Sequence, residues 1–286
     1  MLVPDGAVAA GEVRGGGPGT RESELLYPSA ATPDVHGILF TGGSAHGLGA
    51  ADGVMRWFEE RGIGRETPGG LVPLVPAAVV FDLPLVAPAR PDADAAYAAC
   101  EAAGDVVERG SVGVGTGCTV GKLLGPESWT KGGLGFASEH LGDTQICALA
   151  AVNPFGDVLA EDGSVLGGVW RDGAYERTVD ILRGGFVPPL LSSGENTTLV
   201  CVITDARLTK LEAWLVARAA TAGVARAVDP SATAVDGDLV WCLATGKTDA
   251  DPFVLGALAA HVAAAAIRDG VRQATGAPGC PAASER

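Results

Sequence analysis

Short apolar runs and longer helical patterns follow one another unevenly along the chain, and their order limits the folds it can adopt. Runs rich in β-branched residues predict strands at Val35–Thr41, Ala77–Leu83, Gln145–Val152, Thr198–Thr204 and Leu239–Ala244. Helical patterns fall at about Ala45–Arg61, Asp92–Glu108, Leu208–Val228 and Pro252–Ala274. Because these elements lack a regular βαβ rhythm, we expect an α+β fold with layers around one core.

The remaining segments are punctuated by Gly and Pro. The Gly-rich stretch Gly110–Gly135 predicts ordered loops, and the polar stretch Asp162–Gly194 predicts an excursion over the surface. Residues after Gly276 are expected to fray. The chain has 286 residues, of which 47% are apolar, enough for a well-buried core. We therefore expect residues 1–286 to form a single domain.

The charge of the chain excludes some partners. With 34 acidic and 20 basic residues, the net charge is −14, which repels nucleic acid and anionic membranes. Gly, Pro or a charge interrupts every apolar run before it reaches the length of a membrane span. The first ten residues have neither the basic region nor the long apolar stretch of a signal peptide. We expect no nucleic-acid partner, no membrane partner and a cytoplasmic location.

Cysteine and histidine spacing argues against a metal. The six cysteines have no C-x-x-C spacing and several fall inside apolar runs, so we expect buried free thiols in a reducing compartment. The four histidines are scattered, with no H-E-x-x-H pattern. The sequence therefore predicts no metal site.

Two stretches approach known motifs and miss them. In "GSVGVGTGCTVGKLLG", the phosphate-loop pattern requires Gly at Thr116 and Ser or Thr at Leu123, so we expect no nucleotide cofactor. In "TGGSAHG", the nucleophile-elbow pattern requires Gly at His46. Ser44 is more simply the N-cap of the helix that follows.

The polar stretch Asn196-Thr197-Thr198 stands directly before a predicted buried strand. A hydroxyl at such a junction can attack the preceding carbonyl, move the acyl group from nitrogen to oxygen, and allow water to cleave the ester. The new N-terminal Thr then carries both a nucleophile and a base, because its own α-amine accepts the hydroxyl proton. Taken alone, the three residues are more simply interpreted as an ordinary turn.

Eight stretches, taken together and in order, resemble the self-processing amidohydrolases of the L-aminopeptidase/D-esterase family, especially its nylon-oligomer hydrolases. They are "RGGGPGTRE", "TGGSAHGLGAADGVMRWFEE", "VPAAVVFDL", "GSVGVGTGCTVGKL", "KGGLGFAS", "AVNPFGDV", "NTTLVCVITDARLTK" and "DGDLVWCLATG". The resemblance implies a four-layer α/β/β/α sandwich of the N-terminal-nucleophile type. It also implies autocleavage between Asn196 and Thr197, giving fragments 1–196 and 197–286.

The matched positions imply the remaining catalytic residues, Lys122, Asn153, Asp236 and Asp238. Asp236 and Asp238 are two residues apart at a strand start, so their side chains can share a face and raise each other's pKa. Lys122 could offset that repulsion, and we expect the two carboxylates to orient the Thr197 hydroxyl and amine. Asn153 is a suitable oxyanion ligand. Without the resemblance, Lys122 would be interpreted as a loop cation and Asn153 as part of a turn.

Asn-Thr at the junction and Asp-x-Asp in place of Ser-x-Glu favour the nylon-hydrolase branch. This branch implies hydrolysis of linear 6-aminohexanoate-type oligomers through an acyl–Thr197 intermediate. Phe81 stands near the position where those hydrolases place a tyrosine, so it is the expected substrate contact, without the hydroxyl. The alternatives are an aminopeptidase or esterase acting on short L- or β-peptides, and an uncleaved, non-catalytic relative. The family also implies a homo-oligomer, a tetramer of two-chain units.

Overall fold

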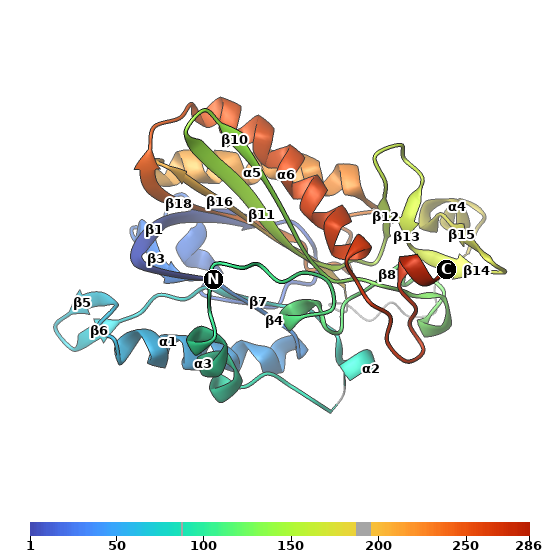
Figure 1. Cartoon of the computed structure of the whole chain (residues 1–286), viewed down its shortest axis with the longest axis horizontal. Helices are drawn as coiled ribbons and strands as arrows, with labels where there is room; N and C mark the ends of the chain where they lie inside the picture. Colours follow the sequence, from blue (N-terminus) through green and yellow to red (C-terminus); the bar gives the residue numbers. More distant parts are fainter. Residues whose placement is uncertain (87, 187–195) are drawn as a thin grey trace.

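The computed structural model describes residues 1–86, 88–186 and 196–286. Its largest sheet has six strands (Figure 1). In spatial order they are β10 (Leu134–Leu141), β11 (Thr144–Asn153), β16 (Thr197–Ala206), β18 (Leu239–Thr248), β1 (Leu2–Val13) and β3 (Asp34–Gly37). β16 pairs antiparallel with β11 and parallel with β18, so it lies inside the sheet with both edges paired.

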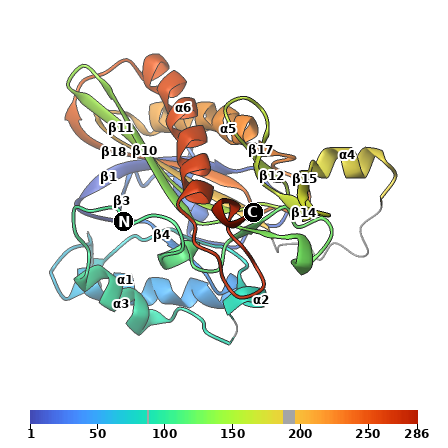
Figure 2. The same ribbon diagram turned by 45° about the vertical axis from the view of Figure 1, so that its right-hand side comes forward.

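Two long helices, α5 (Lys210–Ala227) and α6 (Pro252–Arg272), cover one face of this sheet. The opposite face packs on a three-stranded sheet of β2 (Thr20–Arg21), β7 (Ala77–Val79) and β4 (Leu39–Thr41). Beyond that sheet lie α1 (Ala51–Glu59) and α3 (Ala93–Glu101), at the far side from α5 and α6 (Figure 2). This arrangement confirms the expected α/β/β/α order of layers.

Side chains from both sheets fill the central layer. The rings of Phe40, on β4, and Trp241, on β18, lie 5.5 Å apart between centroids. Trp241 is 1% exposed, and small residues such as Ala9, on β1, bring the two sheets close together. The core therefore fixes the position of β18 relative to the second sheet, whose strand β7 leads directly to Phe81.

Shorter elements complete the chain. The strands are β5 (Arg65–Thr67), β6 (Gly70–Val72), β8 (Thr119–Val120), β9 (Thr130–Lys131), β12 (Asp157–Leu159), β13 (Val165–Gly167), β14 (Val169–Arg171), β15 (Ala174–Glu176) and β17 (Val228–Asp229). The short helices are α2 (Leu83–Val86), α4 (Thr178–Arg183), η1 (Ser23–Leu26), η2 (Ser44–Ala50), η3 (Gly113–Gly115), η4 (Pro126–Ser128) and η5 (Ala283–Glu285).

The structure corrects several expected elements. The apolar pattern did not predict two long strands, β1 and β10, and the helix expected over Asp92–Glu108 ends at Glu101. Ser44 is not a side-chain N-cap, because Gly43 precedes η2 and no capping side chain bonds there. The tail after Gly276 is not frayed: Cys280 and Ala282 are buried, and the Lys131 N–H donates to the Pro281 carbonyl.

The excursion over 162–194 contains β13, β14, β15 and α4, and its residues 187–194 lie outside the described ones.

All six cysteines are free thiols, and five are buried. Contrary to expectation, α6 is long and apolar enough to cross a membrane. It packs on α5, β10 and β11 with most of its apolar side chains buried, which is the position of a core helix.

Candidate active site

Three strands of the large sheet bring the sequence-predicted residues together. Asn153 is the last residue of β11 and pairs with Thr197, the first residue of β16. Asn196 forms a parallel bridge with Asp236, which lies just before β18. Asn153, Asn196, Thr197, Asp236 and Asp238 are all at most 4% exposed. The Asn196–Thr197 junction is therefore buried.

The Thr197 hydroxyl lies against the carbonyl that it would attack. Its Oγ donates to the Asn196 carbonyl oxygen at 2.5 Å. The Gly237 N–H donates to the same carbonyl oxygen at 2.6 Å. A backbone donor on a carbonyl oxygen polarises the bond and stabilises negative charge that develops there during attack. Gly237 was not among the expected residues, since its contribution is a backbone group.

The Asp-Gly-Asp loop has little room at its glycine. A Cβ on Gly237 would lie 2.9 Å from Thr197 Oγ and 2.8 Å from the Gly17 carbonyl oxygen. The Gly17 N–H donates to the Asp236 carbonyl at 2.8 Å, and the Gly15 N–H donates to the Asp238 carbonyl at 3.0 Å. The "RGGG" stretch therefore packs along this loop and sets the position of the Gly237 N–H.

Asp238 holds the backbone on either side of the site. Its Oδ1 accepts the Thr198 N–H at 2.6 Å and its Oδ2 accepts the Ala232 N–H at 2.8 Å. Burial, together with the charge of Asp236, raises the pKa of the Asp238 carboxyl above its ordinary range. Asp238 thus fixes the residue that follows Thr197, whereas the Thr197 hydroxyl itself bonds to Asn196.

Asp236 makes a separate set of hydrogen bonds. Its Oδ1 accepts the Phe155 N–H at 3.0 Å, and its Oδ2 accepts both the N–H and the hydroxyl of Thr233, the latter at 2.5 Å. We expected both carboxylates to orient Thr197 directly. In this structure the two carboxylates instead accept hydrogen bonds from backbone groups of the surrounding loops, and the Thr197 hydroxyl donates to the Asn196 carbonyl.

The Asn153 side chain joins two loops. Its Oδ1 accepts the Thr119 N–H at 2.9 Å, and its Nδ2 donates to the Phe81 carbonyl at 3.1 Å. The donor on the carbonyl of the Asn196–Thr197 bond is the Gly237 N–H, rather than the expected Asn153 amide. Asn153 therefore fixes the strand end from which Phe81 enters the site.

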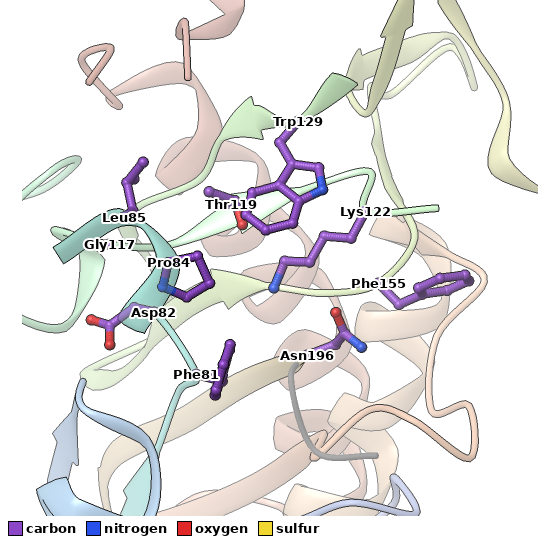
Figure 3. A pocket seen from close by; sticks show the side chains of 10 residues that line it. All are labelled: Phe81, Asp82, Pro84, Leu85, Gly117, Thr119, Lys122, Trp129, Phe155 and Asn196. Carbon is purple, nitrogen blue, oxygen red and sulfur yellow. The ribbon is translucent and has the colours of Figure 1, made fainter. Parts of the chain in front are cut away.

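Lys122 reaches into a small cavity next to Asn196 (Figure 3). Its Nζ donates to the Asn153 carbonyl at 3.0 Å. The cavity has a volume of about 70 Å³, and Phe81 and Trp129 also line it. Since one water takes about 30 Å³ in the liquid, this space suits a few waters rather than an oligomer. The structure thus places Lys122 and Phe81 beside the Asn196–Thr197 bond.

Comparison with known proteins identifies the family of this chain. The model of peptidase family S58 matches residues 1–280. The chain belongs to this family. Its members are hydrolases, so the buried Asn196–Thr197 junction lies in a peptidase-type protein.

Two relatives illustrate the range of names within peptidase family S58. An uncharacterized aminopeptidase of Mycobacterium tuberculosis is 38% identical over 98% of this chain and 87% of its own length. A 6-aminohexanoate-oligomer endohydrolase of Paenarthrobacter ureafaciens is 29% identical over 86% of this chain and 68% of its own length. The expected resemblance to nylon-oligomer hydrolases is confirmed, while the more similar of these two relatives is named an aminopeptidase.

A solved structure confirms the fold class. The L-aminopeptidase D-Ala-esterase/amidase of Ochrobactrum anthropi, described as a variant of the Ntn-hydrolase fold, superimposes with a TM-score of 0.64. The match covers 98% of this chain and 77% of that one, at 17% sequence identity. This S58 chain therefore has an Ntn-hydrolase-like fold.

Proposed function

We propose that this chain cleaves its own Asn196–Thr197 bond and then acts as an amide hydrolase whose nucleophile is the N-terminal Thr197. One observation carries the proposal: the Thr197 hydroxyl and the Gly237 N–H meet at the same Asn196 carbonyl oxygen, at 2.5 and 2.6 Å. A nucleophile and an oxyanion donor on one buried peptide bond are what an acyl shift requires.

In the self-cleavage, Thr197 Oγ bonds to the Asn196 carbonyl carbon, and the carbon–nitrogen bond to Thr197 breaks. The proton leaves the hydroxyl and the amide nitrogen gains one, so the products are an ester and a free α-amine. Water then hydrolyses the ester to the Asn196 carboxylate and restores the Thr197 hydroxyl. The Gly237 N–H stabilises the negative charge on the carbonyl oxygen in both steps.

After cleavage, the same hydroxyl attacks an external amide. The Thr197 α-amine takes its proton, since an α-amine has a pKa of about 7.7–8.0 and is partly neutral at working pH. Asp238, bonded to the Thr198 N–H at 2.6 Å, holds the new chain end in place. Lys122 contributes positive charge beside the reacting group, and release of the Asn196 end opens the small cavity that Asn196 lines.

Two substrate classes fit this reaction. Identity of 29% to a 6-aminohexanoate-oligomer endohydrolase favours amide bonds in linear ω-amino-acid oligomers. Identity of 38% to an uncharacterized aminopeptidase favours short peptides with a free amino end. Turnover of linear 6-aminohexanoate oligomers, compared with turnover of aminoacyl p-nitroanilides, separates them. If Thr197→Ala leaves chain integrity and every measured hydrolysis rate unchanged, the catalytic role of Thr197 is wrong. An intact wild type that hydrolyses none of these substrates favours the non-catalytic relative.

We also propose that the cleaved protein is cytoplasmic and forms a homo-oligomer, a tetramer of two-chain units by analogy with the family. Light scattering coupled to size exclusion tests the assembly. A mass equal to a single chain would contradict it.

A further inference from the structure

Thr233 lies in the loop before β18, and the proposed reaction does not use it. Its hydroxyl donates to Oδ2 of Asp236 at 2.5 Å, and its N–H donates to the same oxygen at 3.1 Å. The Thr233 Oγ also accepts the Val235 N–H at 3.3 Å. A hydroxyl at this distance from a carboxylate oxygen makes a charge-assisted hydrogen bond, which is stronger than a bond between neutral groups. Thr233 therefore holds the Asp236 side chain with two donors.

Asp236 is completely buried, so the position of its carboxylate depends on its donors. Its Oδ1 accepts the N–H of Phe155, a residue that lines the small cavity beside Asn196 (Figure 3). A buried carboxylate that loses a donor pays a desolvation cost, which it relieves by moving or by gaining a proton. Thr233 on one oxygen and Phe155 on the other therefore set the orientation of Asp236.

The peptide group between Asp236 and Gly237 carries the oxyanion donor. Its carbonyl oxygen accepts the Gly17 N–H at 2.8 Å, and its N–H donates to the Asn196 carbonyl oxygen at 2.6 Å. Because a peptide group is planar, its carbonyl and its N–H turn together about the flanking bonds. A change in the backbone angles of Asp236 therefore moves the N–H away from the Asn196 carbonyl.

Thr233 also contacts the stretch that holds the other end of this peptide group. Its carbonyl accepts the Gly16 N–H at 3.1 Å and the Asp236 N–H at 3.3 Å. Ala232, directly before it, has a φ of 52°, a left-handed conformation that is unfavourable for a residue with a Cβ. The Ala232 N–H donates to Asp238 Oδ2 at 2.8 Å, and the next N–H along the chain reaches Asp236. The left-handed residue thus lets two successive N–H groups reach the two carboxylates.

The oxygen that the Gly237 N–H contacts belongs to the carbonyl that accumulates charge during self-cleavage. In that reaction the Asn196 acyl group becomes an ester of Thr197 Oγ. An acyl-enzyme formed from an external amide has the same ester bond to the same Oγ. We therefore expect its carbonyl oxygen to occupy the place of the Asn196 carbonyl oxygen, beside the same N–H.

We propose that Thr233 is a positioning residue for the oxyanion donor: by anchoring Asp236, it holds the Gly237 N–H beside the carbonyl that Thr197 attacks. This role rests on the proposed function and deepens it, since Thr233 does not touch the reacting atoms. Because an oxyanion donor acts on charge that develops in the transition state, loss of the Thr233 hydroxyl should slow bond cleavage without weakening substrate binding.

The first measurement is the first-order rate of self-cleavage, followed by intact mass after cell-free synthesis. Thr233→Val keeps the shape of the side chain and removes its hydroxyl, so it should cleave at least about tenfold more slowly than the wild type. Thr233→Ser keeps the hydroxyl and should cleave at nearly the wild-type rate. Thr67→Val is the matched control: the exposed Thr67 hydroxyl donates to the Gly70 carbonyl at 2.7 Å, also three residues further on, and its loss should leave the rate unchanged.

The second measurement is steady-state hydrolysis by the cleaved enzymes, with whichever of the aminoacyl p-nitroanilides and 6-aminohexanoate oligomers the wild type turns over. In Thr233→Val, kcat should fall by about tenfold or more while KM stays nearly unchanged, which is the pattern of an interaction made only in the transition state. Thr233→Ser should restore kcat. A loop that has only lost rigidity would raise KM as well.

These results separate the role of Thr233 from the proposed function. A wild-type chain that stays intact contradicts both. If the wild type cleaves and Thr233→Val cleaves equally fast, the role of Thr233 alone is overturned. It is also overturned if Thr233→Ser is as slow as Thr233→Val, or if kcat/KM falls through KM alone.

Two further outcomes are decided by the same rates. A wild type that cleaves itself but hydrolyses none of the substrates contradicts the proposed hydrolase activity, and the self-cleavage rates then decide the role of Thr233. If Thr233→Val does not fold, Thr233→Ala removes the hydroxyl without placing a second methyl group beside Asp236, and the same slowing is expected. Self-cleavage of Thr233→Ala at the wild-type rate would overturn the role.

Discussion

The Oγ of Thr197 lies 2.5 Å from the carbonyl oxygen of Asn196, the residue directly before it in the chain. β16 begins at Thr197, and its pairing with β11 and β18 fixes the backbone that carries the hydroxyl. The Gly237 N–H reaches the same oxygen from the loop before β18. The hydroxyl and the Gly237 N–H therefore meet at the carbonyl oxygen of the bond that we propose is cleaved.

Gly237→Ala should slow self-cleavage strongly. The added Cβ would lie 2.9 Å from Thr197 Oγ and 2.8 Å from the Gly17 carbonyl oxygen, so the loop must move and the N–H must leave the Asn196 carbonyl. Loss of one oxyanion donor costs about 10²–10³ in rate. A time course of intact mass measures the effect. Gly104→Ala, where an added Cβ meets nothing within 4 Å, should cleave at the wild-type rate.

Asn153→Ala should lower stability as well as activity. It leaves the buried Thr119 N–H and the Phe81 carbonyl without their side-chain partner, at a cost of about 1–3 kcal/mol for each unsatisfied group. We expect a clear fall in Tm, measured by calorimetry. Gln145→Ala, an exposed position on the same strand, should leave Tm nearly unchanged. An unchanged Tm with reduced kcat would instead assign Asn153 a purely catalytic role.

Stability should depend on pH through Asp157. Burial raises the pKa of its carboxyl to about 6, even though it accepts the Thr178 N–H and hydroxyl and the Val169 N–H. In the unfolded chain an aspartate has a pKa of about 3.9, so between these values the folded state binds more protons. The contribution of Asp157 to stability therefore falls as pH rises from about 4 to 6, and stays low above that range.

Thermal unfolding between pH 4.5 and 7.5 tests this dependence. Asp157→Asn cannot ionise, so the difference in Tm between wild type and variant should shift in favour of the wild type as pH falls. Other titrating groups act in both proteins and cancel in the difference. A difference that stays constant with pH would contradict the role of Asp157.

The sequence alone predicted the helices and strands in which the spacing of apolar residues matches the buried face of the element. β16, β18, α5 and α6 were expected close to their observed positions, because their apolar residues follow the period of each element. The apolar pattern did not identify β1, because Leu2–Val13 contains more Gly and Ala than β-branched residues. It becomes a strand because β18 and β3 pair with it on both sides.

The sequence also predicted several residues of the candidate site. The order of the motifs and the chemistry of threonine pointed to the Asn196–Thr197 junction, and Lys122 and Asp238 lie around it. The donor on the Asn196 carbonyl is the Gly237 N–H, a backbone group whose direction depends on packing against the Gly15–Gly17 stretch.

The most direct test of self-cleavage is the intact mass of the purified protein, with the sequence of any new N-terminus. The wild type should give two masses, for residues 1–196 and 197–286, with threonine as the new N-terminal residue. Thr197→Ser should still cleave because it keeps the hydroxyl, and Thr197→Ala should remain a single chain of full length. A wild-type protein that hydrolyses amides while staying at full-length mass, or a Thr197→Ala chain cut at the same bond, would contradict the account.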